Sequence, residues 1–365
     1  MPDPSPRRRR VLFALCRAYI ASGRPVASAT LAKHLECSSA TIRSELAALE
    51  EHGLLHQPHH AAGRIPTAAG MRLYVQALGA LPPPSVGVCR AVDVSLRDLV
   101  HGPEGMRAAT QVLSELVGCV AVTFVATGRR GVMQQVDLVP VDRVPVHLAP
   151  ARGAQALVVA QLADGGSLVH PVTLDPQVAG DSSGLLRLQE RLRWLCSGKT
   201  LEEARADLTR LWHEHEARVD RLLAESLRVG LWLCTAIAFD PLWVQIAGQR
   251  LLAGQTAASG APLPGGTLAH MLSLFDDYHA LAQLLCQLLP ESVGTPRAEV
   301  HVGTLAEPEK PGVPVGLSLV GCRVQPADDP RIAAVAMLGP DRMDYEAVIP
   351  LVEYAARALA ARASE

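Results

Sequence analysis

The sequence predicts an α+β protein with several domains, and three observations support this prediction. At 365 residues the chain is longer than a single hydrophobic core usually supports. Its first 81 residues combine helical patterns with a short apolar ribbon. Farther along, strand patterns give way to a long helical block and then return. Strands on both sides of a helical block indicate one domain that is interrupted by another.

Apolar residues at helical spacing predict three successive helices at the start of the chain. The first covers residues 9–22 and ends at Gly23, and the second begins at the cap residue Ser28. The third follows the cap residue Ser38 and is expected to bury a sparse stripe formed by Ile42, Leu46 and Leu49.

A ribbon and a fourth helix follow the three helices. The segment LLHQPHHAAGRIP is too rich in Pro, Gly and His for a helix and predicts two short strands with a loop. Thr67 is expected to cap the next helix, and the prolines at 82–84 indicate a linker. Three helices, a ribbon and a closing helix form a winged helix-turn-helix, whose third helix enters the DNA major groove by its N-terminal turn.

The first turn of the third helix is therefore predicted to contact DNA. Its small polar residues allow close approach to base edges, and Arg43 suits a guanine edge or a phosphate. An ion pair of Arg43 with Glu36 or Glu50 is the alternative for this side chain, and protein binding is the alternative for the domain. The predicted DNA-binding residues of this helix are Ser38, Ser39, Ala40, Thr41, Arg43 and Ser44.

Charge supports the same interpretation. Residues 1–80 contain ten Lys and Arg against five Asp and Glu, although the whole chain carries a net charge of −2. A basic head on an acidic body favours contact of the head with a polyanion. The N-terminal arginines, for which a disordered tail is the alternative, are predicted to neutralise phosphates: Arg7, Arg8, Arg9 and Arg10. In the ribbon, His59, His60 and Arg64 are predicted to contact the backbone or the minor groove, and a metal site for the histidines is disfavoured because ligand partners are missing.

The rest of the chain alternates between strand and helix patterns. Residues 183–290 are almost wholly helical in pattern, with a broad apolar surface that includes Trp232 and Trp243. This surface is most simply core, and a dimer interface is the alternative. The predicted strands are 120–128, 131–141, 155–163, 167–174 (joined to the preceding strand by Asp-Gly-Gly at 164–166), 298–305, 316–324 and 331–339, followed by a terminal helix from Asp344.

Three enzyme-like strings carry little weight. SGKT at 197–200 lacks the first glycine of a phosphate-binding loop. GDSSG around Ser182 is more simply explained as a helix cap. The two histidines of HEH at 213–215 point in different directions on a helix and therefore cannot hold one metal ion. No catalytic residue, metal or cofactor is therefore expected. The eight cysteines lack any C-x-x-C pair and predict buried thiols in a reducing cytoplasm. No apolar run is long enough to span a membrane, and Arg17 interrupts the apolar run of an apparent signal peptide.

Two segments resemble the heat-inducible transcription repressors of the HrcA type. The first is SSATIRSELAALEEHGLLHQPHHAAGRIPTAAGMRLYV, and the second is GPDRMDYEAVIPLVEYAARAL at 339–359. VDLVPVD at 136–142 is a weaker match. The sequence departs from the family pattern at Ala29, at His60 and Ala61 in the ribbon loop, and at Met71; Pro350 falls inside the terminal helix.

The resemblance implies a domain order, a function and partners. It implies a winged-helix domain at 1–81, a linker at 82–110, a GAF-like domain at 111–182 and 295–365, and an inserted helical dimerisation domain at 183–294. It also implies a non-enzymatic bacterial homodimer that binds an inverted-repeat (CIRCE) operator of chaperone genes, with a GroEL-type chaperonin as partner. A ligand-gated regulator and a hydrolase that uses Ser182 are the alternatives.

Overall fold

The computed structural model divides the chain into two compact units. Unit 1 consists of Met1–Phe124, Trp243–Val324 and Ala333–Glu365, and unit 2 consists of Val125–Leu242 and Gln325–Ile332. The described residues are 4–58, 62–97, 103–126, 130–140, 156–163, 167–179, 182–215, 220–238, 241–251, 275–292, 296–303, 313, 316–325 and 332–363.

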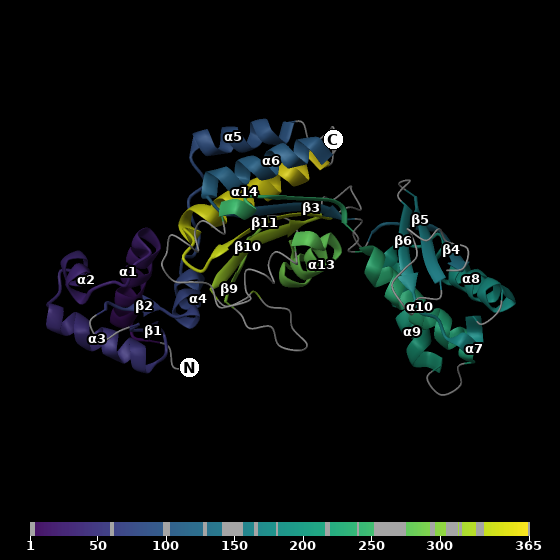
Figure 1. Ribbon diagram of the computed structural model, residues 1–365, viewed down its shortest axis with the longest axis horizontal. Helices are drawn as coiled ribbons and strands as arrows, with labels where there is room; N and C mark the ends of the chain where they lie inside the picture. Colours follow the sequence, from purple (N-terminus) through teal and green to yellow (C-terminus); the bar gives the residue numbers. More distant parts are fainter. Residues whose placement is uncertain are drawn as a thin grey trace. The chain divides into compact units, whose positions relative to one another are not determined.

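Unit 1 begins with a helical head that matches the element order predicted from the sequence (Figure 1). Its three first helices bury apolar stripes against one another, with Leu12 and Leu15 of α1 and Leu46 of α3 fully covered. The hairpin is antiparallel and pairs Leu55 with Pro66. The elements are α1 (Pro6–Ser22), α2 (Ser28–Leu35), α3 (Ser39–Glu51), β1 (Leu55–His56), β2 (Ile65–Pro66) and α4 (Ala68–Gln76).

The predicted linker at 82–110 is wrong, because two helices occupy most of it. These are α5 (Val86–Leu96) and α6 (Pro103–Val117), which pack against each other. α5 also packs against the terminal helix α14 (Tyr345–Ala363), and the hydroxyl of Tyr354 donates to Asp93 Oδ2 at 2.9 Å. Val92 and Leu96 are buried there, so this segment belongs to the body of unit 1, which is the part of unit 1 outside the helical head.

A six-stranded sheet forms the centre of unit 1. Its order is β7-β3-β11-β10-β8, with β9 also paired to β10. Every residue of β10 is buried, as are the first eight residues of β11, so both faces of these strands are covered. This double burial explains their almost continuous apolar sequences. The strands are β3 (Val120–Ala126), β7 (Pro241–Ala247), β8 (Glu291–Ser292), β9 (Glu299–Val302), β10 (Leu317–Val324) and β11 (Ile332–Pro340).

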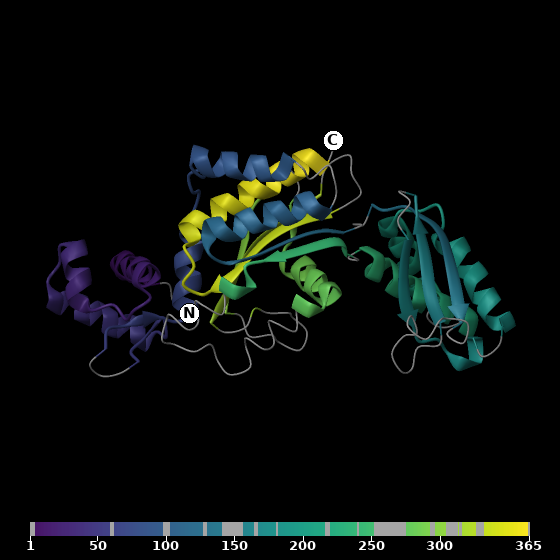
Figure 2. The same ribbon diagram turned by 45° about the horizontal axis from the view of Figure 1, so that its top comes forward.

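Helices cover both faces of this sheet. Figures 1 and 2 show α5, α6 and α14 over one face and α13 (Tyr278–Leu288) over the other. Pro350 lies inside α14 as the sequence predicted. Strand β7 was not predicted, since its residues fall within the block whose pattern reads as helical.

Unit 2 is a three-stranded antiparallel sheet packed against helices. Its sheet order is β4-β5-β6, and β5 and β6 form the expected hairpin, whose connecting residues 164–166 lie outside the described residues. α8 packs on β4 and α10 packs on α8 and α9, which encloses a core that includes Val158, Leu192 and Leu233. The elements are β4 (Met133–Pro140), β5 (Ala156–Leu162), β6 (Ser167–Val172), α7 (Pro176–Ala179), α8 (Ser182–Cys196), α9 (Leu201–His215) and α10 (Arg221–Ala238).

The boundaries of the interruption differ from the sequence prediction. The interrupting unit begins at Val125 and ends at Leu242, not at 183 and 294, and it contains strands as well as helices. The prediction failed because β3 and β4 follow each other closely in sequence but belong to different sheets. Hydrophobic alternation identifies each strand and does not say which sheet it joins.

Two further sequence predictions concern burial. None of the eight cysteines, all of which are described, forms a disulfide, and six of them are buried. Trp232 is not core, because 36% of its surface is exposed.

Within the described part of the chain, the helices are too short or too polar to cross a membrane.

The loop between β11 and α14 contains a carboxyl group in an unfavourable environment. Burial raises the pKa of Asp341 to about 6, although the neighbouring Arg342 partly offsets the effect. An unfolded aspartate titrates near 3.9. The folded protein therefore binds this proton more tightly than the unfolded chain does, and the associated stability is present below pH ~4 and lost as the pH rises through ~6.

Replacing Asp341 by Asn is expected to stabilise the protein at neutral pH. Asn cannot ionise, so the variant avoids burying a charge, and its gain in unfolding free energy over the wild type should grow from near zero at pH ~4 to roughly 2 kcal/mol at pH ~7. Urea unfolding across this range measures the difference. An equal difference at both ends of the range would contradict the raised pKa.

Candidate nucleic-acid interface

The first turn of α3 is an N-capped helix end with small side chains. The hydroxyl oxygen of Ser38 accepts a hydrogen bond from the backbone N–H of Thr41 at 3.1 Å, and the two hydroxyl groups lie 2.8 Å apart. This cap predicted from the sequence is confirmed. Capping uses one of the free N–H groups, and the others still face outward at the positive end of the helix dipole.

The exposed face of α3 extends the small surface beyond its first turn. Ala40, Arg43, Ser44 and Ala47 recur at helical spacing and are all exposed, opposite the buried stripe of the same helix. Ala47 was not predicted as part of this surface, because alanine carries no polar group that would indicate a contact. Alanine and serine flank Arg43 on both sides, and the next exposed residue along this face is Glu51 at the C-terminal end of the helix.

The guanidinium of Arg43 is available for a partner outside the chain. One of its nitrogens, Nη2, donates to Ser39 Oγ at 3.4 Å, within the same helix. Among the described residues no carboxylate lies within ion-pair distance of it, and Glu50 is instead bound by Arg64. The alternative of an ion pair with Glu36 or Glu50 is therefore wrong.

The N-terminal arginines belong to α1 and not to a disordered tail. Arg8 Nε donates to Glu45 Oε2 at 3.1 Å, and Arg7 Nε lies 3.7 Å from Glu45 Oε1. Both side chains therefore tie α1 to α3, and they share one carboxylate. Arg10 remains exposed.

The hairpin is fastened to α3 by Arg64. Its Nε donates to Glu50 Oε2 at 2.9 Å, and only 19% of its side chain is exposed. Its backbone also forms an antiparallel bridge with Val26. Arg64 thus positions the hairpin. To contact a phosphate as well, it would have to do so while bound to Glu50. His59 and His60 lie outside the described residues.

The structure adds two basic residues that were not predicted from the sequence. Arg24 and Lys33 are exposed, and in the described part of the chain neither forms an ion pair. They lie at the turn after α1 and on α2. Like Arg10 and Arg43, they are exposed basic side chains of the head that form no ion pair among the described residues.

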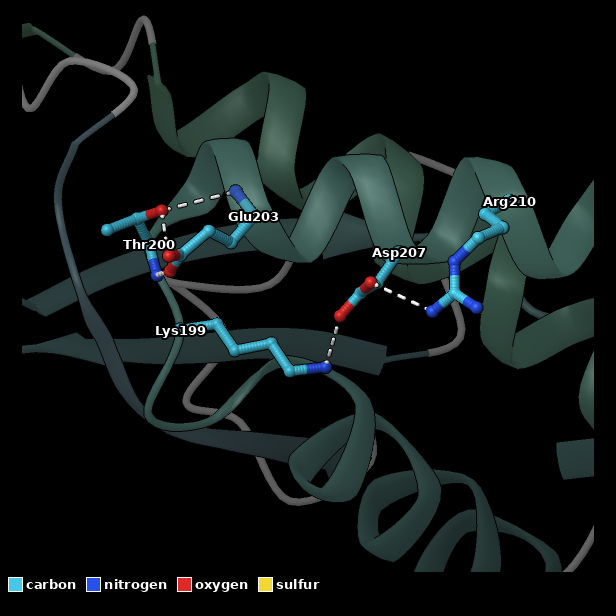
Figure 3. Close-up of polar contacts among 5 residues, drawn as sticks. All are labelled: Lys199, Thr200, Glu203, Asp207 and Arg210. Carbon is cyan, nitrogen blue, oxygen red and sulfur yellow. Dashed lines mark hydrogen bonds and ion pairs between the residues drawn. The ribbon is translucent and has the colours of Figure 1, made fainter.

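The SGKT string belongs to a helix cap (Figure 3). Thr200 and Glu203 cap α9 reciprocally: Glu203 Oε2 accepts from the Thr200 N–H at 2.9 Å, and Thr200 Oγ1 accepts from the Glu203 N–H at 3.1 Å. Lys199 Nζ donates to Asp207 Oδ2 at 2.8 Å, and Asp207 also accepts from Arg210. These bonds lower the pKa of Asp207, with the bond from Lys199 as the largest cause. The Lys199 side chain is therefore occupied by its ion pair with Asp207 of α9.

The other enzyme-like strings also lie at ordinary helix positions. Ser182 is the first residue of α8, and His213 lies near the end of α9. Within the described ranges, no group of three His, Cys, Asp or Glu side chains is placed to hold a metal ion.

The turn between α2 and α3 contains the one described non-glycine residue with a positive φ. Glu36 has φ 51° and ψ 39°, which is the left-handed region. Its N–H bonds to Ala32 O and so closes α2. A side chain in this region costs energy that glycine avoids.

Comparison with known proteins links these features to one family. The family profile described as the HrcA protein C-terminal domain matches residues 104–349. The chain is 32% identical to a heat-inducible transcription repressor HrcA of Xanthomonas campestris over 99% of this chain and 96% of that protein. It is 31% identical to the protein of the same name from Sorangium cellulosum, over 98% of both. A crystal structure described as a hypothetical protein has a TM-score of 0.50 at 19% identity, covering 98% of this chain and 97% of that one.

Replacing Glu36 by Gly is expected to stabilise the α2–α3 turn. The gain should be about 0.5–1 kcal/mol, because relief of the left-handed strain exceeds the added entropy of the unfolded chain. Native-state hydrogen exchange of α2 and α3 reports the local change. Ala47→Gly, on the exposed face of α3, serves as control and should instead lower protection by about 1 kcal/mol. Equal losses in both variants would contradict the assigned strain.

Proposed function

Because the chain belongs to the HrcA family of heat-inducible transcription repressors, we propose that it represses chaperone operons by binding an inverted-repeat, CIRCE-type operator as a homodimer. The family is one of transcription repressors, and the chain is not an enzyme. It acts in the bacterial cytoplasm, at the nucleoid when bound to DNA.

The exposed face of α3 is the observation that carries this proposal. It presents one uncompensated arginine among alanine and serine residues, with the helix N-terminus at its leading end. Arginine can donate two hydrogen bonds to the O6 and N7 atoms of guanine, and small neighbours allow the helix to approach the base edges. The element order of the head supports its assignment as a winged helix, in which this helix occupies the major groove.

The proposed contacts divide into base readers and phosphate contacts. Ser39, Ala40, Arg43 and Ser44 face the bases, and Arg10 contacts phosphate without reading sequence. Arg24 and Lys33 join the phosphate contacts because they are exposed and uncompensated. Arg7, Arg8 and Arg64 act mainly by holding α1 and the hairpin on α3.

A homodimer is proposed because an inverted repeat presents the same sequence twice. Unit 2 supports this proposal, since it exposes several large apolar side chains: Val169 (56%), Leu186 (59%), Trp194 (73%) and Trp212 (40%). Exposed tryptophans are characteristic of interface centres. The body, with its six-stranded sheet and covering helices, is assigned as GAF-like on the family resemblance.

Regulation by heat is proposed on the family relationship as well. A GroEL-type chaperonin would maintain the form that binds DNA, and unfolded protein would divert the chaperonin during heat stress. Addition of the purified chaperonin should therefore raise the active fraction of the repressor, and competing unfolded protein should abolish the gain.

Replacing Arg43 by Ala is expected to reduce discrimination between operator and random DNA. Loss of a bidentate base contact should cost about 1–3 kcal/mol, or roughly 5- to 150-fold in the affinity ratio. Fluorescence anisotropy with both duplexes measures the ratio. Lys33→Ala is the matched control, because loss of a phosphate contact should weaken both duplexes equally and reduce the salt slope by about 1. An unchanged ratio in Arg43→Ala would exclude it from base reading.

Replacing Trp194 by Ser is expected to weaken the homodimer. Removal of an interface tryptophan should raise the dimer dissociation constant by roughly tenfold or more. Sedimentation velocity over a concentration series measures this constant. Val86→Ser is the matched control, since Val86 is 78% exposed on α5 of unit 1 and should leave the constant unchanged. A dimer of wild-type strength in Trp194→Ser would remove this surface from the interface.

A further inference from the structure

The loop and first turn of α14 form the attachment point of the head within unit 1. Two head helices donate to one carboxylate oxygen there: Arg17 Nε of α1 and the hydroxyl of Tyr74 of α4 each lie 2.7 Å from Glu346 Oε1. Both bonds lower the pKa of Glu346, with the bond from Tyr74 as the larger cause. A single charged acceptor thus joins two helices that are far apart in sequence.

The donors are unequal in strength. Arg17 and Glu346 are 64% and 40% exposed, so solvent screens this ion pair and it contributes little. Tyr74 is buried, and its ring contacts Phe13 edge-on with centroids 5.8 Å apart. Its hydroxyl is therefore held in place before it donates, and a hydrogen bond to a charged acceptor is among the stronger kinds.

Other contacts strengthen the same attachment. Arg72 Nη1 of α4 donates to the carbonyl of Val302 in β9 at 3.1 Å. Arg342 lies against Gly23 at the C-terminal end of α1, where its guanidinium leaves no room for a Cβ atom on residue 23. A cation is favoured at this end of a helix.

Glu346 is fixed to the sheet through the preceding residue, Tyr345. Tyr345 is fully buried, and its hydroxyl donates to the carbonyl of Asp341 at 2.8 Å. Ser318 of β10 bonds to the same hydroxyl at 2.7 Å. The backbone before Glu346 is therefore held on strand β10.

We propose that Glu346, through Tyr74 and Arg17, is a positioning residue that sets the orientation of the DNA-reading head on the body. The residue touches no DNA. It fixes the direction in which each protomer presents α3, and so determines which separation of half-sites a dimer accepts. The idea rests on the proposed function, because the separation matters only for a dimer on an inverted repeat.

The energetic reason is preorganisation. A head held in one orientation loses no further freedom when both half-sites are engaged at the matching separation. A loosened head reaches half-sites at several separations and binds each less selectively. Contact between α3 and a single half-site depends on α3 alone and should not change.

Tyr74→Phe tests this proposal with the smallest change, because it removes the donor and keeps the ring. Tyr354→Phe is the matched control: it removes the same group from a bond to Asp93 within the body. Two measurements are made on the full-length protein. Hydrogen exchange reports the head attachment without DNA, and binding to inverted repeats of varied spacing, with single half-sites alongside, reports the function.

The expected result is specific to the head variant. Tyr74→Phe should exchange faster in α4 and in the first turn of α14, and its preference for the best spacing over offset spacings should fall roughly tenfold at unchanged half-site affinity. Tyr354→Phe should change neither measurement. Unchanged exchange in Tyr74→Phe, or faster exchange with an unchanged spacing preference, would overturn the positioning role. Failure of the wild type to prefer any duplex would refute the proposed function, whereas exchange would still report whether Glu346 holds the head.

Discussion

The burial of Tyr345 is the constraint on which the arrangement of unit 1 depends. Its hydroxyl is satisfied by Ser318 of strand β10 and by the carbonyl of Asp341, so the chain enters α14 at a defined position. Without these bonds a buried hydroxyl would be costly. The next residue, Glu346, then meets the head, and the same short loop connects the sheet, the terminal helix and the N-terminal helices.

Charge in the head is used in two ways. Arg7 and Arg8 share Glu45 of α3 and hold α1 on this helix. Arg64 binds Glu50 and holds the hairpin on the same helix. Arg43 is matched by no carboxylate of the described chain and faces outward. The net positive charge of a segment therefore overstates what is available for DNA, since part of it stabilises the fold that presents the rest.

The interrupted topology separates two tasks. Unit 1 contains the head and the sheet to which the head is attached, whereas unit 2 has a hydrophobic core of its own. The described core of unit 2 contains no tryptophan, and Trp194 and Trp212 are exposed outside it. This property makes them available for association, as the proposed dimer requires.

The sequence by itself determined the local elements: the caps at Ser38 and Thr67, the sparse stripe of α3, the hairpin of β5 and β6, and the strands of the C-terminal part. These follow from periodicity and capping, which act over a few residues. Only the tertiary structure decided that β3 and β4 join different sheets, that the expected linker is packed helix, and that Arg64 and Arg8 bind glutamates. Those outcomes depend on which distant residues meet, since pairing between residues far apart in the chain leaves no periodic trace in either segment.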